Sequence, residues 1–296
     1  MRETDWGNQE SIGALCQEHR PILETGNHVT AINSNFILTR WDSWPKEIPG
    51  SHSPITLRTN LFLEIEKWSR DTAATWSLAR NGDTAVEIMF GQQYETLRRL
   101  FSDVTLQIDG FLFSAGGNDL VAENLPNFLN TYRDGMQWMD CINMPFLDRR
   151  FLEVQSAYQR LADLRDAYKP QTYIFTHAYD LAVPSGDEVH ILIFTKGGWL
   201  KKQFLKKGIQ DFPIQQQIVT YMLTRFASLM EEFESQHNRI VYVRTQGTLD
   251  SASDWGDELH PTTEGFKKIV VKIEKALKTV FPVLPKPSAI LKSIDE

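Results

Sequence analysis

The chain has 296 residues, of which 42% are hydrophobic and 23% charged, and this ordinary globular composition excludes wholesale disorder. Its 31 basic and 38 acidic side chains give a formal net charge of −7. General affinity for nucleic-acid backbones needs clustered positive charge, so the acidic balance argues against that class of partner. A chain of this length buries about three quarters of the surface that its unfolded form exposes. It therefore needs no disulfide or structural metal to hold a core.

Short β-branched or aromatic runs alternate with longer helical patterns, which is typical of an α/β protein with a parallel sheet and crossover helices. Some of the runs are almost wholly apolar, as expected for strands covered on both faces. In chain order the pattern predicts a strand at 35–39, a strand at 74–78, a helix at 84–101, a strand at 109–113, a helix at 151–168, a strand at 172–176, a helix at 215–234, a strand at 239–243 and a helix at 263–279.

The remaining stretches define the expected domain organisation. Residues 1–34 lack clear periodicity and are expected to form an N-terminal arm or cap. Residues 35–281 form one expected domain with an insertion at about 181–208, and prolines predict an extended tail over 282–296. Insertions of this kind lie over the carboxyl ends of the strands in open α/β proteins, so this one is expected to shape a substrate entrance.

The two cysteines, Cys16 and Cys141, are too few for a disulfide framework, and we expect two free thiols in a reducing compartment. The first residues carry acids where a signal peptide would carry bases and then an apolar run. No apolar stretch reaches the roughly eighteen residues of a membrane-spanning helix. These features predict a cytoplasmic protein without a transmembrane segment.

Residues suited to nucleophilic catalysis follow the predicted strands. Trp41-Asp42-Ser43-Trp44 follows the first strand, and Asp257-Glu258-Leu259-His260-Pro261 comes after the last. Nucleophilic catalysis needs a hydroxyl, a base and a carboxylate that orients the base, and Ser43, His260 and Asp257 offer that set. The three-residue spacing of Asp257 and His260, about one turn, lets both side chains project from one side of a loop or helix start.

A third segment, Ser114-Ala115-Gly116-Gly117-Asn118-Asp119, follows the strand at 109–113. Asn118, presented by the flexible glycine pair, could supply an amide donor to an oxyanion, and the backbone amides of Ser43 and Gly82 could supply two more. Taken singly, the glycine segment is most often a turn and the His-Pro pair a loop boundary. Their joint occurrence after separate strands favours the catalytic interpretation.

These segments resemble the sequence blocks of the SGNH hydrolases, the GDSL lipase/esterase superfamily. Ser43 matches the family's serine block, Gly82 its glycine block, Gly116–Asp119 its Gly-x-Asn-Asp block and Asp257–Pro261 its Asp-x-x-His-Pro block. Trp41 stands where the family usually has glycine. The resemblance spans about residues 35–279. It implies a three-layer α/β/α fold with a five-stranded parallel flavodoxin-like sheet and a site at its carboxyl edge.

The resemblance also implies a serine esterase or lipase that forms an acyl-serine intermediate. Ser43 is its nucleophile, Asp257 and His260 complete the triad, and the Ser43 and Gly82 amides with Asn118 form the oxyanion hole. Ser34, Ser51 and Ser53 are the nearby alternatives to the nucleophile. Three other functions stay open: a catalytically compromised binding module, an acyltransferase with the same residues, and a phospholipase or lysophospholipase.

Further residues have weaker functional indications. Trp41, Trp44 and His177 are candidates for the substrate rim, although a satisfied histidine at a strand end is the alternative for His177. A basic amphipathic segment contains four lysines, Lys201, Lys202, Lys206 and Lys207. It suggests a peripheral membrane contact, with a solvated helix face as the alternative. No Cys/His/Asp cluster has metal-ligand spacing, and no nucleotide-binding motif occurs, so neither metal nor cofactor is expected.

Overall fold

The computed structural model describes residues 36–39, 61, 65, 74–78, 82–191, 194–250 and 252–282. Its main sheet has five strands, and each begins and ends within one residue of a run that the sequence predicts as a strand. The strands are β1 (Phe36–Thr39), β2 (Ala74–Ser77), β3 (Gly110–Phe113), β4 (Tyr173–His177) and β7 (Ile240–Val243).

The strands follow the spatial order β2-β1-β3-β4-β7. β3 pairs parallel with β4, and β4 pairs parallel with β7. β1 pairs antiparallel with both β2 and β3. The expected α/β class with parallel strands is confirmed. Parallel pairing joins three strands and not five, however, so the prediction of a wholly parallel sheet is wrong.

The direction of β1 is a property that its residues do not encode. Side chains of a strand alternate between the two faces with period two, and this alternation is the same when the strand is read in either direction. The apolar run at 35–39 therefore predicts a strand without fixing which way it runs. Direction depends on the connections to the neighbouring strands and on the packing of the whole sheet.

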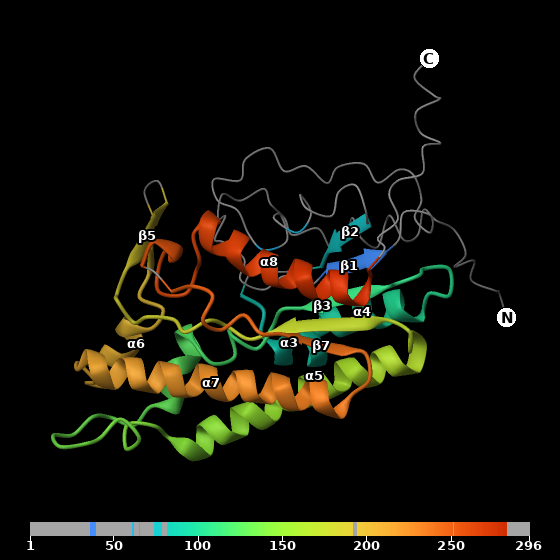
Figure 1. Ribbon diagram of the computed structural model, residues 1–296. Helices are drawn as coiled ribbons and strands as arrows, with labels where there is room; N and C mark the ends of the chain where they lie inside the picture. The colour runs from blue at the N-terminus through green and yellow to red at the C-terminus, as the bar shows by residue number, and fades with distance from the viewer. Residues whose placement is uncertain are drawn as a thin grey trace.

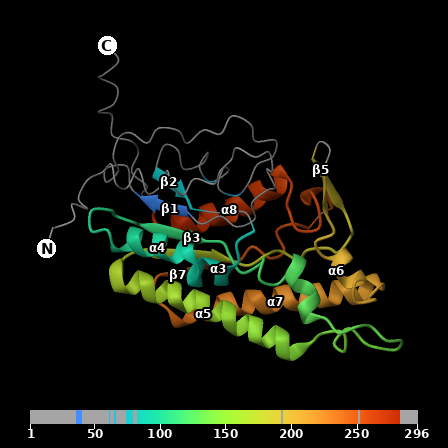
Figure 2. The ribbon, with the colours of Figure 1, turned by 180° about the vertical axis from the view of Figure 1, so that it is seen from behind.

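Two hydrophobic cores lie on opposite faces of the sheet, which makes the arrangement three-layered (Figures 1 and 2). In β3, Phe111 and Phe113 belong to the larger core and Leu112 to the smaller one. β4 divides in the same way, with Ile174 in the larger core and Phe175 in the smaller. Strands covered on both faces give continuous apolar runs, which explains why these strands were visible in the sequence.

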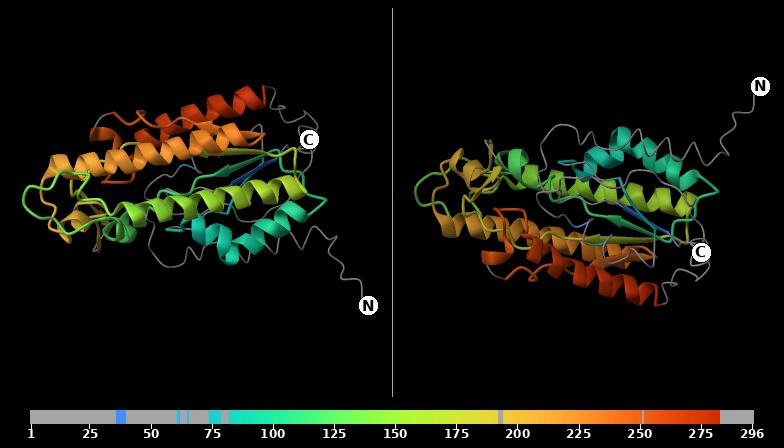
Figure 3. Two further views of the ribbon diagram at one scale, coloured as in Figure 1. Left: turned by 90° about the horizontal axis from the view of Figure 1, so that it is seen from below. Right: turned by 90° about the horizontal axis from the view of Figure 1, so that it is seen from above.

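Helices cover both faces of the sheet. The larger core lies under α3 (Ala85–Phe90), α4 (Gln92–Ser102), α5 (Met144–Tyr168) and α7 (Phe212–Gln236), and the smaller under α8 (Thr263–Val280). The left view of Figure 3 shows α5 and α7 lying side by side along the sheet. Leu61 and Ile65, both helical and buried, contribute to the smaller core.

The predicted helix at 84–101 is two helices, because the helical conformation is interrupted at Gly91. Gly91 has extended backbone angles, and a Cβ there would lie 2.4 Å from the carbonyl oxygen of Glu87. Thr84 caps α3: its side chain accepts a hydrogen bond from the Glu87 amide, and the Glu87 carboxylate accepts one from the Thr84 amide. Glycine thus permits a sharp change of direction inside a helical pattern.

The two longest helices begin earlier than the apolar spacing predicts. α5 and α7 each carry a proline in the first turn, Pro145 and Pro213, where a missing amide hydrogen costs no intrahelical bond. Asp211 caps α7 by accepting a 2.9 Å hydrogen bond from the Ile214 amide. The fourth predicted helix corresponds to α8, which Thr262 caps.

The insertion at 181–208 contains a hairpin and a short helix that the sequence did not predict: β5 (Glu188–Ile191), β6 (Phe194–Gly197) and α6 (Lys201–Leu205). Two short 3₁₀ helices, η2 (Ala122–Phe128) and η3 (Ala252–Asp254), complete the elements. The expected N-terminal arm lies outside the described residues, as does the expected tail beyond Pro282. None of the helices described here has the length and apolar character needed to cross a membrane.

Candidate active site

Asp257 and His260 form a buried, directly hydrogen-bonded pair. Nδ1 of His260 lies 2.8 Å from each carboxylate oxygen of Asp257. Since the carboxylate can only accept, Nδ1 carries the hydrogen and the lone pair resides on Nε2. No hydrogen bond to Nε2 is found from the part of the chain that the structure describes. The pair is therefore an imidazole oriented by a carboxylate, and within the described chain its basic nitrogen has no partner.

The surrounding backbone holds Asp257 in its ionised form. Burial raises the pKa of the Asp257 carboxyl, but the His260 side chain and the backbone amides of Leu259 and His260 donate hydrogen bonds that outweigh it, so the pKa lies below the ordinary aspartate value. The loop itself is closed by a bridge between Trp255 and Pro261 just before α8 begins. A fixed carboxylate beside an imidazole is what the three-residue spacing predicted.

The loop after β3 contains two glycines at positions where a residue with a side chain would not fit. A Cβ on Gly117 would lie 1.7 Å from Cε2 of Tyr179, and Gly116 adopts a left-handed φ of +99° with a Cβ position 2.5 Å from the Phe226 ring. Both glycines are thus required by close packing and not only by a turn. Their effect is to bring Asn118 to the surface side of the loop, where it is half-buried.

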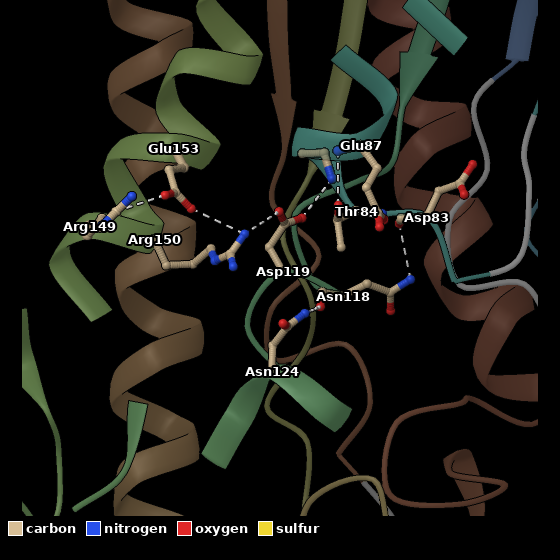
Figure 4. Close-up of polar contacts among 10 residues, drawn as sticks. Asp83, Thr84, Glu87, Asn118, Asp119, Asn124, Arg149, Arg150 and Glu153 are labelled. Atoms are coloured by element: carbon tan, nitrogen blue, oxygen red, sulfur yellow. Dashed lines mark hydrogen bonds and ion pairs between the residues drawn. The ribbon is translucent and has the colours of Figure 1, made fainter. Parts of the chain in front are cut away.

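Asn118 contacts the loop that precedes α3 (Figure 4). Its side-chain nitrogen donates a 3.2 Å hydrogen bond to the carbonyl oxygen of Asp83, next to Gly82. Asn124 in turn donates to the carbonyl oxygen of Asn118 at 3.0 Å. Gly82 has a left-handed φ of +85° and open space around it. The structure therefore brings two of the proposed oxyanion-hole residues, Asn118 and Gly82, to adjacent loops.

Asp119, beside Asn118, was missed by the sequence analysis. It is fully buried, and its Oδ2 accepts a 2.7 Å hydrogen bond from the Ala85 amide in the first turn of α3. Its Oδ1 lies 3.9 Å from the Arg150 guanidinium, too far for a hydrogen bond (Figure 4). Burial is the main cause that raises the pKa of Asp119 to about 6. An acid directly after Asn118 was the available signal.

His177 and Ser114 form a second buried pair, at the ends of β4 and β3. The Ser114 hydroxyl lies 2.7 Å from Nε2 of His177, and Nδ1 lies 3.1 Å from the carbonyl oxygen of Ala178. Both ring nitrogens thus have partners, and burial lowers the pKa of His177. This is the geometry of a satisfied histidine at a strand end. This pairing could not be predicted from the sequence, because the two residues lie at the ends of different strands.

A small cavity of about 30 Å³, room for roughly one water molecule, lies beside this pair and the His260 loop. His177 and Asp180 line it from the end of β4, and Leu259 and Pro261 line it from the loop that carries His260. His177 thus lies near the loop that carries His260, and its imidazole is buried.

Three of the predicted site residues, Ser43, Trp41 and Trp44, lie outside the described residues. The end of β1 that precedes them is described. Thr39 pairs with Ala74 of β2 and lies past Leu38, which pairs with the first residue of β3. The carboxyl end of β1 is therefore at the edge where β3 begins, whereas the His260 loop follows the carboxyl end of β7 (Figure 1).

The basic segment packs its apolar residues inward. Leu200 and Phe204 are fully buried in the larger core, and Leu205 is about half exposed. Lys201 donates to the Ser185 carbonyl and Lys206 to the Gln203 side chain. Nothing in this arrangement supports a peripheral membrane contact.

Across the described residues, no three His, Cys, Asp or Glu side chains are grouped so as to hold a metal ion.

Comparisons with known proteins do not assign this chain to a family. No protein-family model matches the chain, and no curated protein sequence matches it significantly. Among solved structures that align with it is a carbohydrate esterase family 3 protein from Talaromyces cellulolyticus, with 12% sequence identity and a TM-score of 0.36. The alignment covers 69% of this chain and 71% of that one. At such values, fold and activity have to be argued from the residues themselves.

Proposed function

We propose that the protein is a serine hydrolase of the SGNH type, acting on carboxylic esters through an acyl-serine intermediate. Residues 35–281 are its catalytic domain, Ser43 is its nucleophile, and His260 is its general base. The observation that carries the proposal is the buried Asp257–His260 pair, in which one ring nitrogen is held by a carboxylate and the other is left with a lone pair.

The reaction follows from these roles. Nε2 of His260 takes the proton of the Ser43 hydroxyl while the oxygen bonds to the ester carbonyl carbon. The carbon–oxygen bond to the alcohol then breaks, and the imidazolium returns the proton to the departing alkoxide. Water, activated by the same nitrogen, attacks the acyl-serine and releases the acid. Asp257 stabilises the imidazolium in both halves, because its carboxylate stays ionised.

Asn118 is the side-chain donor proposed for the oxyanion. Its amide group has two hydrogens, one of which is used on the Asp83 carbonyl. The second hydrogen is available to a developing negative charge, and the Gly82 and Ser43 amides are the proposed backbone donors. Loss of a single donor of this kind lowers turnover about 100- to 1,000-fold.

The test uses p-nitrophenyl esters of increasing acyl length. Ser43→Ala and His260→Ala should abolish hydrolysis while circular dichroism and thermal unfolding stay near those of the parent protein. Ser34→Ala, Ser51→Ala and Ser53→Ala serve as matched controls that should keep their activity. Full activity of Ser43→Ala would refute the assignment of the nucleophile.

A second candidate, a binding module without hydrolytic activity, is favoured by the direction of β1. In an antiparallel β1 the carboxyl end, Thr39, lies at the sheet edge where β3 begins, and the loop of His260 follows the opposite edge, where β7 ends. A fluorophosphonate probe separates the two functions, since it labels only an activated serine. Labelling that disappears in Ser43→Ala supports the hydrolase, and a protein that never labels and never hydrolyses esters supports the binding module.

A further inference from the structure

Glu258 lies between Asp257 and Leu259 in the loop that carries His260, and it is almost fully buried, with 1% of its surface exposed. Its Oε1 accepts hydrogen bonds from the backbone amides of Gly186 and Lys201, both at 2.9 Å, and its Oε2 accepts one from Leu200 at 2.8 Å. No lysine, arginine or histidine of the described chain forms an ion pair with it. Among the described residues, the hydrogen bonds to this buried carboxyl group all come from backbone amides.

The three amides come from both ends of the β5–β6 hairpin. Gly186 precedes β5, and Leu200 and Lys201 follow β6. The Glu258 carboxylate therefore joins the two ends of the hairpin to each other and to the loop that carries His260. Lys201 adds a second tie, because its ammonium donates to the Ser185 carbonyl at 3.1 Å.

The hydrogen bonds to Glu258 hold the backbone at Leu200 and thereby fix the position of Trp199, the residue before it. The rings of Trp199 and His260 lie 5.6 Å apart between centroids, with 70° between their planes. Leu200 is fully buried and anchors the backbone at this point. The indole nitrogen of Trp199 is itself buried and has no hydrogen-bond partner among the described residues. A large aromatic side chain with an unused donor thus stands against the proposed base.

We infer that Glu258 is a positioning residue that holds Trp199 against His260, and that Trp199 forms the subsite for the alcohol portion of the ester. This inference rests on the proposed function. The base returns its proton to the departing alkoxide, so the group packed on the imidazole contacts the alcohol side of the ester. An indole favours an apolar or aromatic alcohol there, and it also favours the transient imidazolium by its ring face.

Glu258→Gln keeps the size of the side chain but replaces one acceptor oxygen by a donor. At least one of the three amides then loses its partner. Amide hydrogen exchange of the full-length protein should quicken about tenfold or more at Gly186, Leu200 and Lys201, and the His260 ring resonances should shift. Glu264→Gln, on the exposed first turn of α8 where Glu264 pairs with Lys267, is the control and should change neither. Unchanged exchange at the three amides would overturn the positioning role, and so would a Glu258→Gln protein that fails to fold.

Kinetics test the subsite with two esters of one acid, benzyl acetate and methyl acetate. Trp199→Leu should lower kcat/KM for benzyl acetate about tenfold and that for methyl acetate much less, and Trp199→Phe should restore most of the loss. Glu258→Gln should show the same selectivity change. Equal losses on both esters would overturn the subsite. A parent protein that hydrolyses p-nitrophenyl esters but neither of these two esters would overturn the subsite and leave the proposed function standing. A parent protein that hydrolyses no ester would overturn both, while exchange and the ring resonances still decide the positioning of Trp199.

Discussion

The hydroxyl oxygen of Ser114 lies 2.7 Å from Nε2 of His177. The two residues are neighbours because each comes directly after a residue of the last β3–β4 pair, Phe113 and Thr176, in the parallel register. The carbonyl oxygen of Ala178 accepts from Nδ1, so Nε2 carries the lone pair and accepts the serine hydrogen. The pair looks like a nucleophile and a base, but Ser114 is 1% exposed, and Nδ1 of His177 is held by a backbone carbonyl and not by a carboxylate. Its chemistry is that of a structural hydrogen bond.

Ser114→Ala should therefore cost stability and not activity. The variant leaves Nε2 of His177 buried without a partner, which should lower the free energy of unfolding by about 1–3 kcal/mol. Urea denaturation measures this loss, and ester hydrolysis at a temperature where the variant is folded should stay within about threefold of the parent. An inactive Ser114→Ala protein of unchanged stability would instead make Ser114 the reacting serine.

Asp257→Asn should lower kcat strongly without unfolding the protein. The amide oxygen can still accept from the Leu259 and His260 amides, which preserves the loop, but its NH₂ group favours the wrong tautomer of His260. Replacing the carboxylate of a Ser-His-Asp triad in this way costs about 10⁴-fold in turnover. Steady-state kinetics and thermal unfolding give the two readouts. A loss below about tenfold would contradict the role of Asp257.

Asp119 should make the protein less stable as the pH rises through about 6. The pKa of this carboxyl is raised from 3.8 to about 6, so between these values the folded state binds more protons than the unfolded state. Its contribution is fully present below pH 3.8 and is lost as the pH rises through the folded value. A shift of this size corresponds to about 3 kcal/mol.

Asp119→Asn isolates this effect, because its amide oxygen can still accept from the Ala85 amide and does not titrate. The free energy of unfolding of the parent minus that of the variant should decline by about 2 kcal/mol between pH 4 and pH 7 in urea titrations. The exposed Asp134→Asn supplies the control. A difference that does not change with pH would contradict the buried, raised pKa.

Gly117→Ala and Gly135→Ala separate steric from backbone effects. The new Cβ at position 117 overlaps the Tyr179 ring, at 1.7 Å, and should cost about 3 kcal/mol or more. Gly135 has a left-handed φ of +87° and open space around it, so its substitution should cost only about 1 kcal/mol. Urea denaturation compares the two. Gly117→Ala should also lower ester hydrolysis, because Asn118 follows directly, and equal costs at both positions would contradict the close packing.

Lys202→Gln combined with Lys206→Gln should change binding to anionic phospholipid vesicles less than about twofold. The apolar partners of these lysines, Leu200 and Phe204, are buried in the core and are not available to a bilayer. Vesicle co-sedimentation measures the binding. A large loss in the double variant would restore the membrane-contact hypothesis for this segment.

The sequence by itself determined the features that local patterns encode. Apolar, β-branched or aromatic runs located every strand of the main sheet, and those of β3 and β4 are continuous because both faces of these strands are covered. The Asp257–His260 pair was predictable because both residues belong to one short loop, and Thr84 because a capping box is a four-residue pattern. Gly91 is the exception among the local features: an isolated glycine in a helical pattern does not show that the helix will break.

Only the tertiary structure decided the relationships between distant segments. The direction of β1, the Ser114–His177 bond and the attachment of Glu258 to the hairpin each join residues that are far apart along the chain. A side chain encodes its own size and chemistry, whereas its partner depends on how all strands and helices pack together. The contact between Asp257 and His260 could therefore be predicted from the sequence, whereas the contact between Trp199 and His260 is seen only in the fold.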